Sequence, residues 1–226
     1  MKKFIVFLFL LIYPINSFAH IGHYTKYNKI EMGIFRNGVL IGYNNYFFKR
    51  NGEETIVSNE IKFSVKLLGK TVFKVEGYSE EKYIKDQLVS YNSKTLQNDK
   101  EKFVNLTLDK KNKKFNIKGS SYSGKASLNS IIGNWWNHKI LQASSQISPI
   151  SGSIKKQVVN FIGKEKIDLF GKIYDVDHFT ITSKDMTIPK DKRLDFNIWY
   201  DRENLVILKV SYSRMGNWEY KLMNFE

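Results

Sequence analysis

The chain has 226 residues, no cysteine and a formal net charge of +14 at neutral pH. Because it lacks cysteine, disulfide bonds, thiol catalysis and a cysteine-linked lipid anchor are excluded. The length is sufficient for one sizeable hydrophobic core.

Residues 1–19 have the composition of a secretory signal peptide. Two lysines open the segment, an apolar run follows over Phe4–Tyr13, and small residues precede a cleavage site after Ala19. The run is too short for a membrane span, which needs ~20 residues. We therefore expect a periplasmic protein with one β domain over residues 20–226 and no transmembrane segment.

Alternation of apolar and polar residues predicts strands along most of the mature chain. The clearest segments are Ile61–Leu67, Val104–Leu108, Phe115–Ile117, Phe196–Tyr200, Val206–Tyr212 and Trp218–Leu222. Turn residues separate them, and Asn37-Gly38 is typical of a two-residue β-hairpin loop. We expect roughly eleven or twelve short strands with antiparallel neighbours.

The predicted fold is all-β: one curved antiparallel sheet, or half-open barrel, with a single helical or irregular insert over Ala126–Leu141. An outer-membrane barrel is disfavoured, because it needs strands of ~9–11 residues with an apolar outer face. The expected strands are shorter, and both faces carry lysine in places.

Several segments together resemble a known family. They are SNEIKFSVKLL (58–68), VFKVEGYSEEKYIKDQLVSYNSKT (72–95), WWNHKIL (135–141), SPISG (148–152) and FNIWYDRENLVILKV (196–210). Their order is similar to that in a family of exported proteobacterial proteins of unknown function. Tyr83 stands where that pattern often has Trp, and His138 stands where Pro is usual.

The resemblance implies a curved sheet similar to the half-barrels of the periplasmic lipoprotein carriers LolA and LolB. Such a sheet has a concave apolar face, which either a plug or a ligand must fill. Trp135, Trp136, Ile140 and Tyr83 are the candidate lining residues for an apolar or amphipathic ligand, such as a lipid. In the alternative interpretation the two tryptophans anchor the insert against the sheet.

The residues that could carry catalysis are not arranged in a recognised pattern. His138 has no nucleophile or metal-ligand pattern around it. Asp175 and Asp177 share one face of a predicted strand, whereas His178 points to the other. Lysines surround the acidic cluster Glu76, Glu80 and Glu81, which favours ion pairing over glycoside hydrolysis.

The predicted new N-terminus offers a different chemistry. His20 would bring its amine and ring nitrogen to one copper ion, and His23 or His138 could complete the ligand set. We nevertheless expect no cofactor, because a chain tip is usually poorly ordered.

The net positive charge limits the kinds of binding partner that the sequence suggests. Lysines and arginines number 36 against 22 acidic residues, and five of the 36 are arginine. The excess would suit an anionic envelope surface, but a solvated lysine-rich face is the simpler explanation and the one that we favour. No nucleic-acid-binding motif is present.

We expect a non-enzymatic periplasmic protein that binds an apolar or amphipathic ligand or an envelope partner. The alternatives are a periplasmic enzyme, either a hydrolase or copper-dependent, and a purely structural envelope protein.

Overall fold

The computed structural model describes residues 24–226. The predicted signal peptide, the cleavage site after Ala19, and the possible copper ligands His20 and His23 lie outside these residues. Within the described part, no helix has the length and apolar character needed to cross a membrane.

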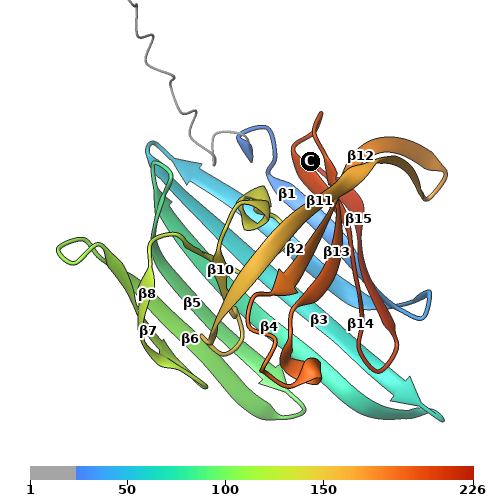
Figure 1. The fold of residues 1–226 in the computed structure, drawn as a ribbon, viewed down its shortest axis with the longest axis horizontal. Helices are drawn as coiled ribbons and strands as arrows, with labels where there is room; N and C mark the ends of the chain where they lie inside the picture. Colours follow the sequence, from blue (N-terminus) through green and yellow to red (C-terminus); the bar gives the residue numbers. More distant parts are fainter. Residues whose placement is uncertain (1–23) are drawn as a thin grey trace, which may run out of the picture.

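The described residues form 15 strands and two short 3-10 helices (Figure 1). In chain order these elements are β1 (Lys29–Arg36), β2 (Val39–Asn51), β3 (Glu54–Leu67), β4 (Lys70–Ile84), β5 (Gln87–Gln97), β6 (Lys100–Asp109), β7 (Lys114–Gly119), β8 (Ser123–Ser127), β9 (Ser130–Ile132), η2 (His138–Leu141), β10 (Ser145–Ile147), β11 (Ile154–Leu169), β12 (Lys172–Ser183), η3 (Lys190–Lys192), β13 (Asp195–Asp201), β14 (Val206–Ser213) and β15 (Asn217–Phe225).

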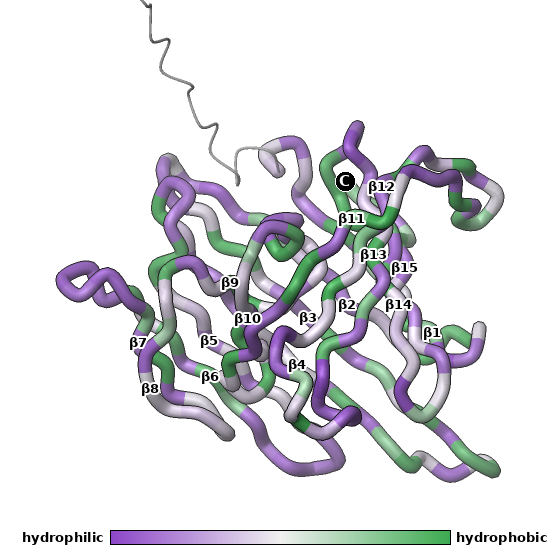
Figure 2. Tube along the Cα trace, in the orientation of Figure 1, coloured by the Kyte–Doolittle hydropathy of each residue, from purple (hydrophilic) through white to green (hydrophobic). Residues whose placement is uncertain are grey.

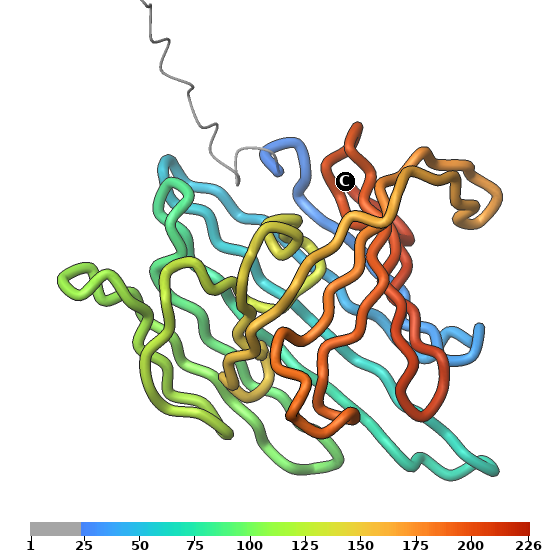
Figure 3. The backbone as a smooth tube through the Cα atoms, in the orientation of Figure 1, coloured from blue at the N-terminus to red at the C-terminus, as the bar shows by residue number. Residues whose placement is uncertain are grey.

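All the strands belong to one sheet, in the order β8-β7-β6-β5-β4-β3-β2-β1-β15-β14-β13-β12-β11-β10-β9. Neighbours are antiparallel except β9 and β10, which are parallel. The sheet curls until its two edges approach each other, so the molecule is a nearly closed barrel (Figures 1 and 3). The predicted all-β fold with a curved sheet is confirmed.

Two details of the prediction were wrong. The strands are more numerous and longer than expected: β3, β4 and β11 have 14, 15 and 16 residues. Bulges near Lys66, Tyr83 and Ile162 shift the inward-facing positions by one residue and interrupt the two-residue period. The predicted insert also contains a strand, β9, and part of β8.

One turn closes most of the gap between the sheet edges. The Tyr91 and Ser93 side chains of β5 both donate hydrogen bonds to the carbonyl oxygen of Pro149. On β7, Gly119 lies so close that a Cβ atom there would be 2.6 Å from the Ser151 carbonyl oxygen. A glycine at this position therefore lets the turn reach the opposite edge.

The hydrophobic core fills the inside of the curled sheet. Apolar residues line its inner face along most strands, and loops and strand ends are mainly polar (Figure 2). Chain segment 133–144, which contains η2, enters the barrel and packs against the inner face (Figure 1). We call this segment the plug.

Candidate functional site

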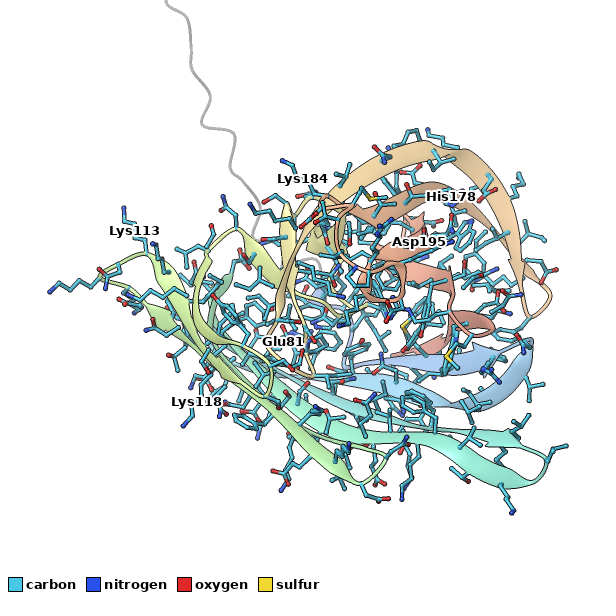
Figure 4. All side chains as sticks on the ribbon, turned by 60° about the horizontal axis from the view of Figure 1, so that its bottom comes forward. Glu81, Lys113, Lys118, His178, Lys184 and Asp195 are labelled. Atoms are coloured by element: carbon cyan, nitrogen blue, oxygen red, sulfur yellow. The ribbon has the colours of Figure 1, made fainter. Side chains whose placement is uncertain are left out.

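The carboxyl group of Glu81, on β4, lies at the centre of the barrel. Its side chain is turned into the interior, between the two sides of the curled sheet (Figure 4), and the residue is only 2% exposed. An isolated buried carboxylate is costly, so its partners decide what the site can do.

Three side chains donate hydrogen bonds to Glu81. The Tyr83 hydroxyl lies 2.6 Å from Oε2, and the Trp136 indole nitrogen lies 2.9 Å from Oε1. The Asn134 amide nitrogen lies 2.5 Å from the same Oε1 atom. Because Asn134 and Trp136 belong to the plug, Glu81 fastens the plug to the sheet.

Burial and hydrogen bonding act on Glu81 in opposite directions. Desolvation is the larger effect and raises the pKa of Glu81 to about 7, while the donors Tyr83, Trp136 and Asn134 lower it. The site thus holds a carboxyl group that changes charge near neutral pH.

Aromatic contacts reinforce the attachment of the plug. The Trp136 ring packs edge-on against Tyr24, Phe48 and Tyr83, with centroid distances of 5.1, 5.4 and 6.0 Å. Trp136 is 1% exposed and Ile140 is fully buried. Trp136, Ile140 and the Tyr83 ring are therefore parts of the packed core.

The Trp135 side chain packs against a different part of the sheet. Its ring contacts Phe196 and Tyr220, at 5.1 and 6.1 Å. It forms one wall of a half-enclosed cavity of about 210 Å³ between the plug and the inner face of the sheet. Of the four predicted lining residues, Trp135 is the one that this cavity contacts; Tyr83 borders a second cavity of about 320 Å³ behind the plug.

The cavity beside Trp135 has a polar floor and aromatic walls. The polar residues are Asn44, Asn59, Ser79, Glu81, Ser93, Thr95 and Asn134, and the aromatic ones include Tyr46, Tyr91, Trp135, Phe196, Tyr212 and Tyr220. Arg214 is the only cationic residue in the lining. The cavity combines an apolar body with several neutral hydrogen-bonding groups, which is typical of small-molecule sites.

Most of the floor is internally bonded, with one exception. Asn59 donates to Asn44 at 2.7 Å, and Asn44 donates to the Tyr46 hydroxyl at 2.7 Å. The Oδ1 atom of Asn134 is buried and accepts no hydrogen bond from any residue in the described part of the chain. A buried acceptor without a donor is destabilising, so this atom is a local weakness in the attachment of the plug.

The two histidines of the described chain lie in separate places. His138 Nδ1 lies 2.7 Å from the Tyr24 hydroxyl, which also accepts from the His138 backbone nitrogen at 3.0 Å. His178 stacks on Trp199 and contacts Asn197 and Glu165. Neither histidine lines the central cavity, and no group of three His, Cys, Asp or Glu side chains in residues 24–226 is arranged to hold a metal ion.

Sequence reasoning missed the centre of the site. It treated Glu81 as one of three surface carboxylates, because Glu76 and Glu80 stand close to it. In the fold Glu81 faces inward, with the buried residues Val75, Ser79 and Tyr83 on the same strand. The sequence did contain one sign of this: Glu81 is separated by an even number of residues from the apolar positions Val75 and Tyr83, so all three share one face of the strand.

Fold and site together define a class: a cysteine-free, all-β, barrel-like protein with a plugged interior. The chain belongs to the family described as domain of unknown function DUF6134, which matches residues 32–223. The predicted membership of a family of unknown function is thereby confirmed. No curated protein matches the chain.

A solved structure shares the fold. It is a beta-barrel-like protein of domain of unknown function DUF1849 from Brucella abortus, 12% identical, with a TM-score of 0.57. The likeness covers 88% of this chain and 95% of the other. At this identity it shows the architecture alone, and the expected similarity to the LolA and LolB carriers stays a prediction.

Proposed function

We propose that the protein is an exported, non-catalytic binding protein whose barrel interior holds a compact ligand. The observation that carries this proposal is the cavity beside Trp135, with aromatic walls around a floor of amides, hydroxyls and one buried carboxyl group. We place the protein in the periplasm on the strength of residues 1–19.

The cavity size limits the ligand. A volume of about 210 Å³ is below the ~300–1,000 Å³ of drug-sized sites. A whole phospholipid does not fit inside, so the ligand is a small amphipathic molecule or one end of a larger one. This narrows the original expectation of an apolar or amphipathic ligand.

The lining also limits the chemistry of the ligand. Burial raises the pKa of Glu81 to about 7, so this carboxyl group is only partly ionised at neutral pH, and Arg214 is the only cationic residue in the lining. The floor offers neutral amides and hydroxyls beside the aromatic walls. The site therefore favours a small ligand with an apolar face and hydrogen-bonding groups that match this floor.

The enzymatic alternatives have less support. Catalysis by His138 or His178 would require one of them to approach Glu81 or the cavity, and their hydrogen-bond partners lie elsewhere. The copper hypothesis for His20 and His23 stays a prediction, because these residues lie outside the described part of the chain.

Native mass spectrometry of protein purified from its own envelope tests the proposal. We expect an adduct that denaturation releases. Ser79→Leu, which fills the cavity floor, should lose the adduct, and Ser58→Leu, on the outer face of the neighbouring strand, should keep it. A clean ligand-free mass in the unaltered protein would refute the binding function and favour the structural envelope role.

A further inference from the structure

One end of the barrel exposes apolar side chains that the fold does not use. The antiparallel order brings the β1–β2, β3–β4 and β14–β15 turns to the same end of the sheet. We call the three turn segments, residues 36–40, 66–72 and 213–217, the apolar rim. The β3–β4 tip is visibly hydrophobic at the lower right of Figure 2.

Leu68 and Met215 dominate this rim. They are 96% and 91% exposed, more than any other large apolar residue in the described chain. Val39, Leu40, Leu67 and Val72 are each more than half exposed beside them. Solvent-exposed apolar side chains occur singly on most proteins, but a group at one end marks an interaction site.

The backbone makes these two residues more unusual. Leu68 and Met215 have φ angles of +49° and +50°, in the left-handed region that bulky residues avoid. The equivalent position of the β1–β2 turn holds Asn37, which adopts this conformation readily. Folding alone would favour asparagine or glycine in all three turns. Phe170 and Leu205 also have positive φ angles, so it is the combination with 96% and 91% exposure that distinguishes Leu68 and Met215.

Hydrogen bonds join two of the three turns, β1–β2 and β14–β15. Asn37 donates its backbone N–H to the Asn217 carbonyl oxygen at 2.7 Å, and the Asn37 side chain accepts from the Asn217 N–H at 2.9 Å. The Arg36 guanidinium donates to the Met215 carbonyl oxygen at 2.5 Å. The β1–β2 and β14–β15 tips thus form one fixed surface.

The charge of the rim is uniformly positive. The three segments contain Arg36, Lys66, Lys70 and Arg214 and no acidic residue. None of these four cations forms an ion pair with a carboxylate of the described chain.

We propose that the apolar rim docks the barrel on an anionic lipid surface. Leucine and methionine on separate projecting tips suit insertion among lipid headgroups, and cations between them suit the headgroup phosphates. Arg214 both belongs to the rim and lines the central cavity, so docking brings the cavity close to the lipid. The docking inference stands independently of the proposed ligand.

Vesicle co-sedimentation tests this inference. The protein is the chain from His20 onward, which lacks the predicted signal peptide and retains every residue that the structure describes. We expect binding to vesicles of equal parts phosphatidylglycerol and phosphatidylcholine, and weak binding to pure phosphatidylcholine. K66Q/K70Q should lower the affinity roughly 25-fold, at about fivefold per cation.

Leu68→Asn separates docking from folding. Asparagine suits the left-handed backbone, so the variant should be at least as stable as the unaltered protein while its vesicle affinity falls at least roughly fivefold. Two matched controls should change the affinity little: K110Q/K111Q, with the same charge change in the β6–β7 turn at the opposite end, and Ile162→Asn, an exposed apolar residue on β11.

Site-specific labelling then shows which end meets the lipid. The chain has no cysteine, so Leu68→Cys carries a single environment-sensitive fluorophore. Its emission should shift to the blue with anionic vesicles, and a label at Lys111→Cys should not respond. Absence of binding, equal loss in K110Q/K111Q, or dimerisation through the rim without lipid would each overturn the proposal.

Discussion

The buried carboxyl group of Glu81 makes the stability of the barrel depend on pH in an unusual direction. Most paired carboxylates stabilise a fold when they are ionised, whereas burial raises the pKa of Glu81 to about 7. Below the ordinary pKa of 4.5 the group is protonated in both the folded and unfolded states. Between pH 4.5 and pH 7 the unfolded state loses the proton while the folded state keeps it, so the stability of the fold falls over this range and is constant above it.

The size of the effect follows from the two pKa values. A carboxyl group that titrates at about 7 in the fold and at 4.5 when unfolded costs about 3 kcal/mol above pH 7. For a domain of this size that corresponds to a melting temperature lower by roughly 6–12 °C. Solvent screens the charge of this carboxylate very little, because Glu81 is 2% exposed.

Glu81→Gln isolates this contribution. The amide keeps an acceptor for Asn134 and Trp136, and its nitrogen can donate to the Tyr83 oxygen. We expect the unfolding free energy of the variant, relative to the unaltered protein, to rise by about 3 kcal/mol between pH 4.5 and pH 8.

Urea denaturation across this pH range measures the difference, since other titrating groups cancel between the two proteins. Glu80→Gln, whose side chain lies on the opposite face of β4, is the control and should leave the difference flat. A constant difference for Glu81→Gln, or one of opposite sign, would show that its hydrogen bonds outweigh burial and would refute the reasoning.

Three further outcomes follow from the packing. Trp136→Ala should lower the unfolding free energy by about 3–5 kcal/mol in urea denaturation, because it removes the largest of the fully buried side chains. Tyr24→Phe should cost about 1–3 kcal/mol and speed hydrogen exchange of the His138 amide, which donates to that hydroxyl at 3.0 Å. Gly119→Ala should push away the Ser151 carbonyl, 2.6 Å from the new Cβ, and hydrogen exchange should show the closing turn released from β7.

The adjacent residues Trp135 and Trp136 show what can and cannot be predicted from the sequence. Because both are large aromatic residues, the sequence predicted that they are buried, and both are. The sequence could not tell whether they anchor the plug or line a pocket. The structure divides the two roles: Trp136 is bonded to Glu81 in the core, and Trp135 borders the cavity. Adjacent residues in an irregular segment point in directions that only the final packing selects.

The site itself was less predictable than the fold. Asn134 and Tyr24 carried no motif, and Tyr24 meets His138 across 114 positions of sequence. Leu68 lies between β3 and β4, and only the fold shows that its side chain is 96% exposed there. Contacts between distant segments follow from register, and a bulge shifts register without a clear local signal.

The amino-acid sequence by itself determined the all-β class, the antiparallel hairpins and the lack of cysteine chemistry. These properties depend on composition, on the two-residue period and on turn residues, all of which are local. The tertiary structure alone decided that the sheet nearly closes, that Glu81 faces inward, and that three turns form one apolar rim. Those properties depend on curvature and on long-range packing, which accumulate over many strands and leave no signature in any one of them.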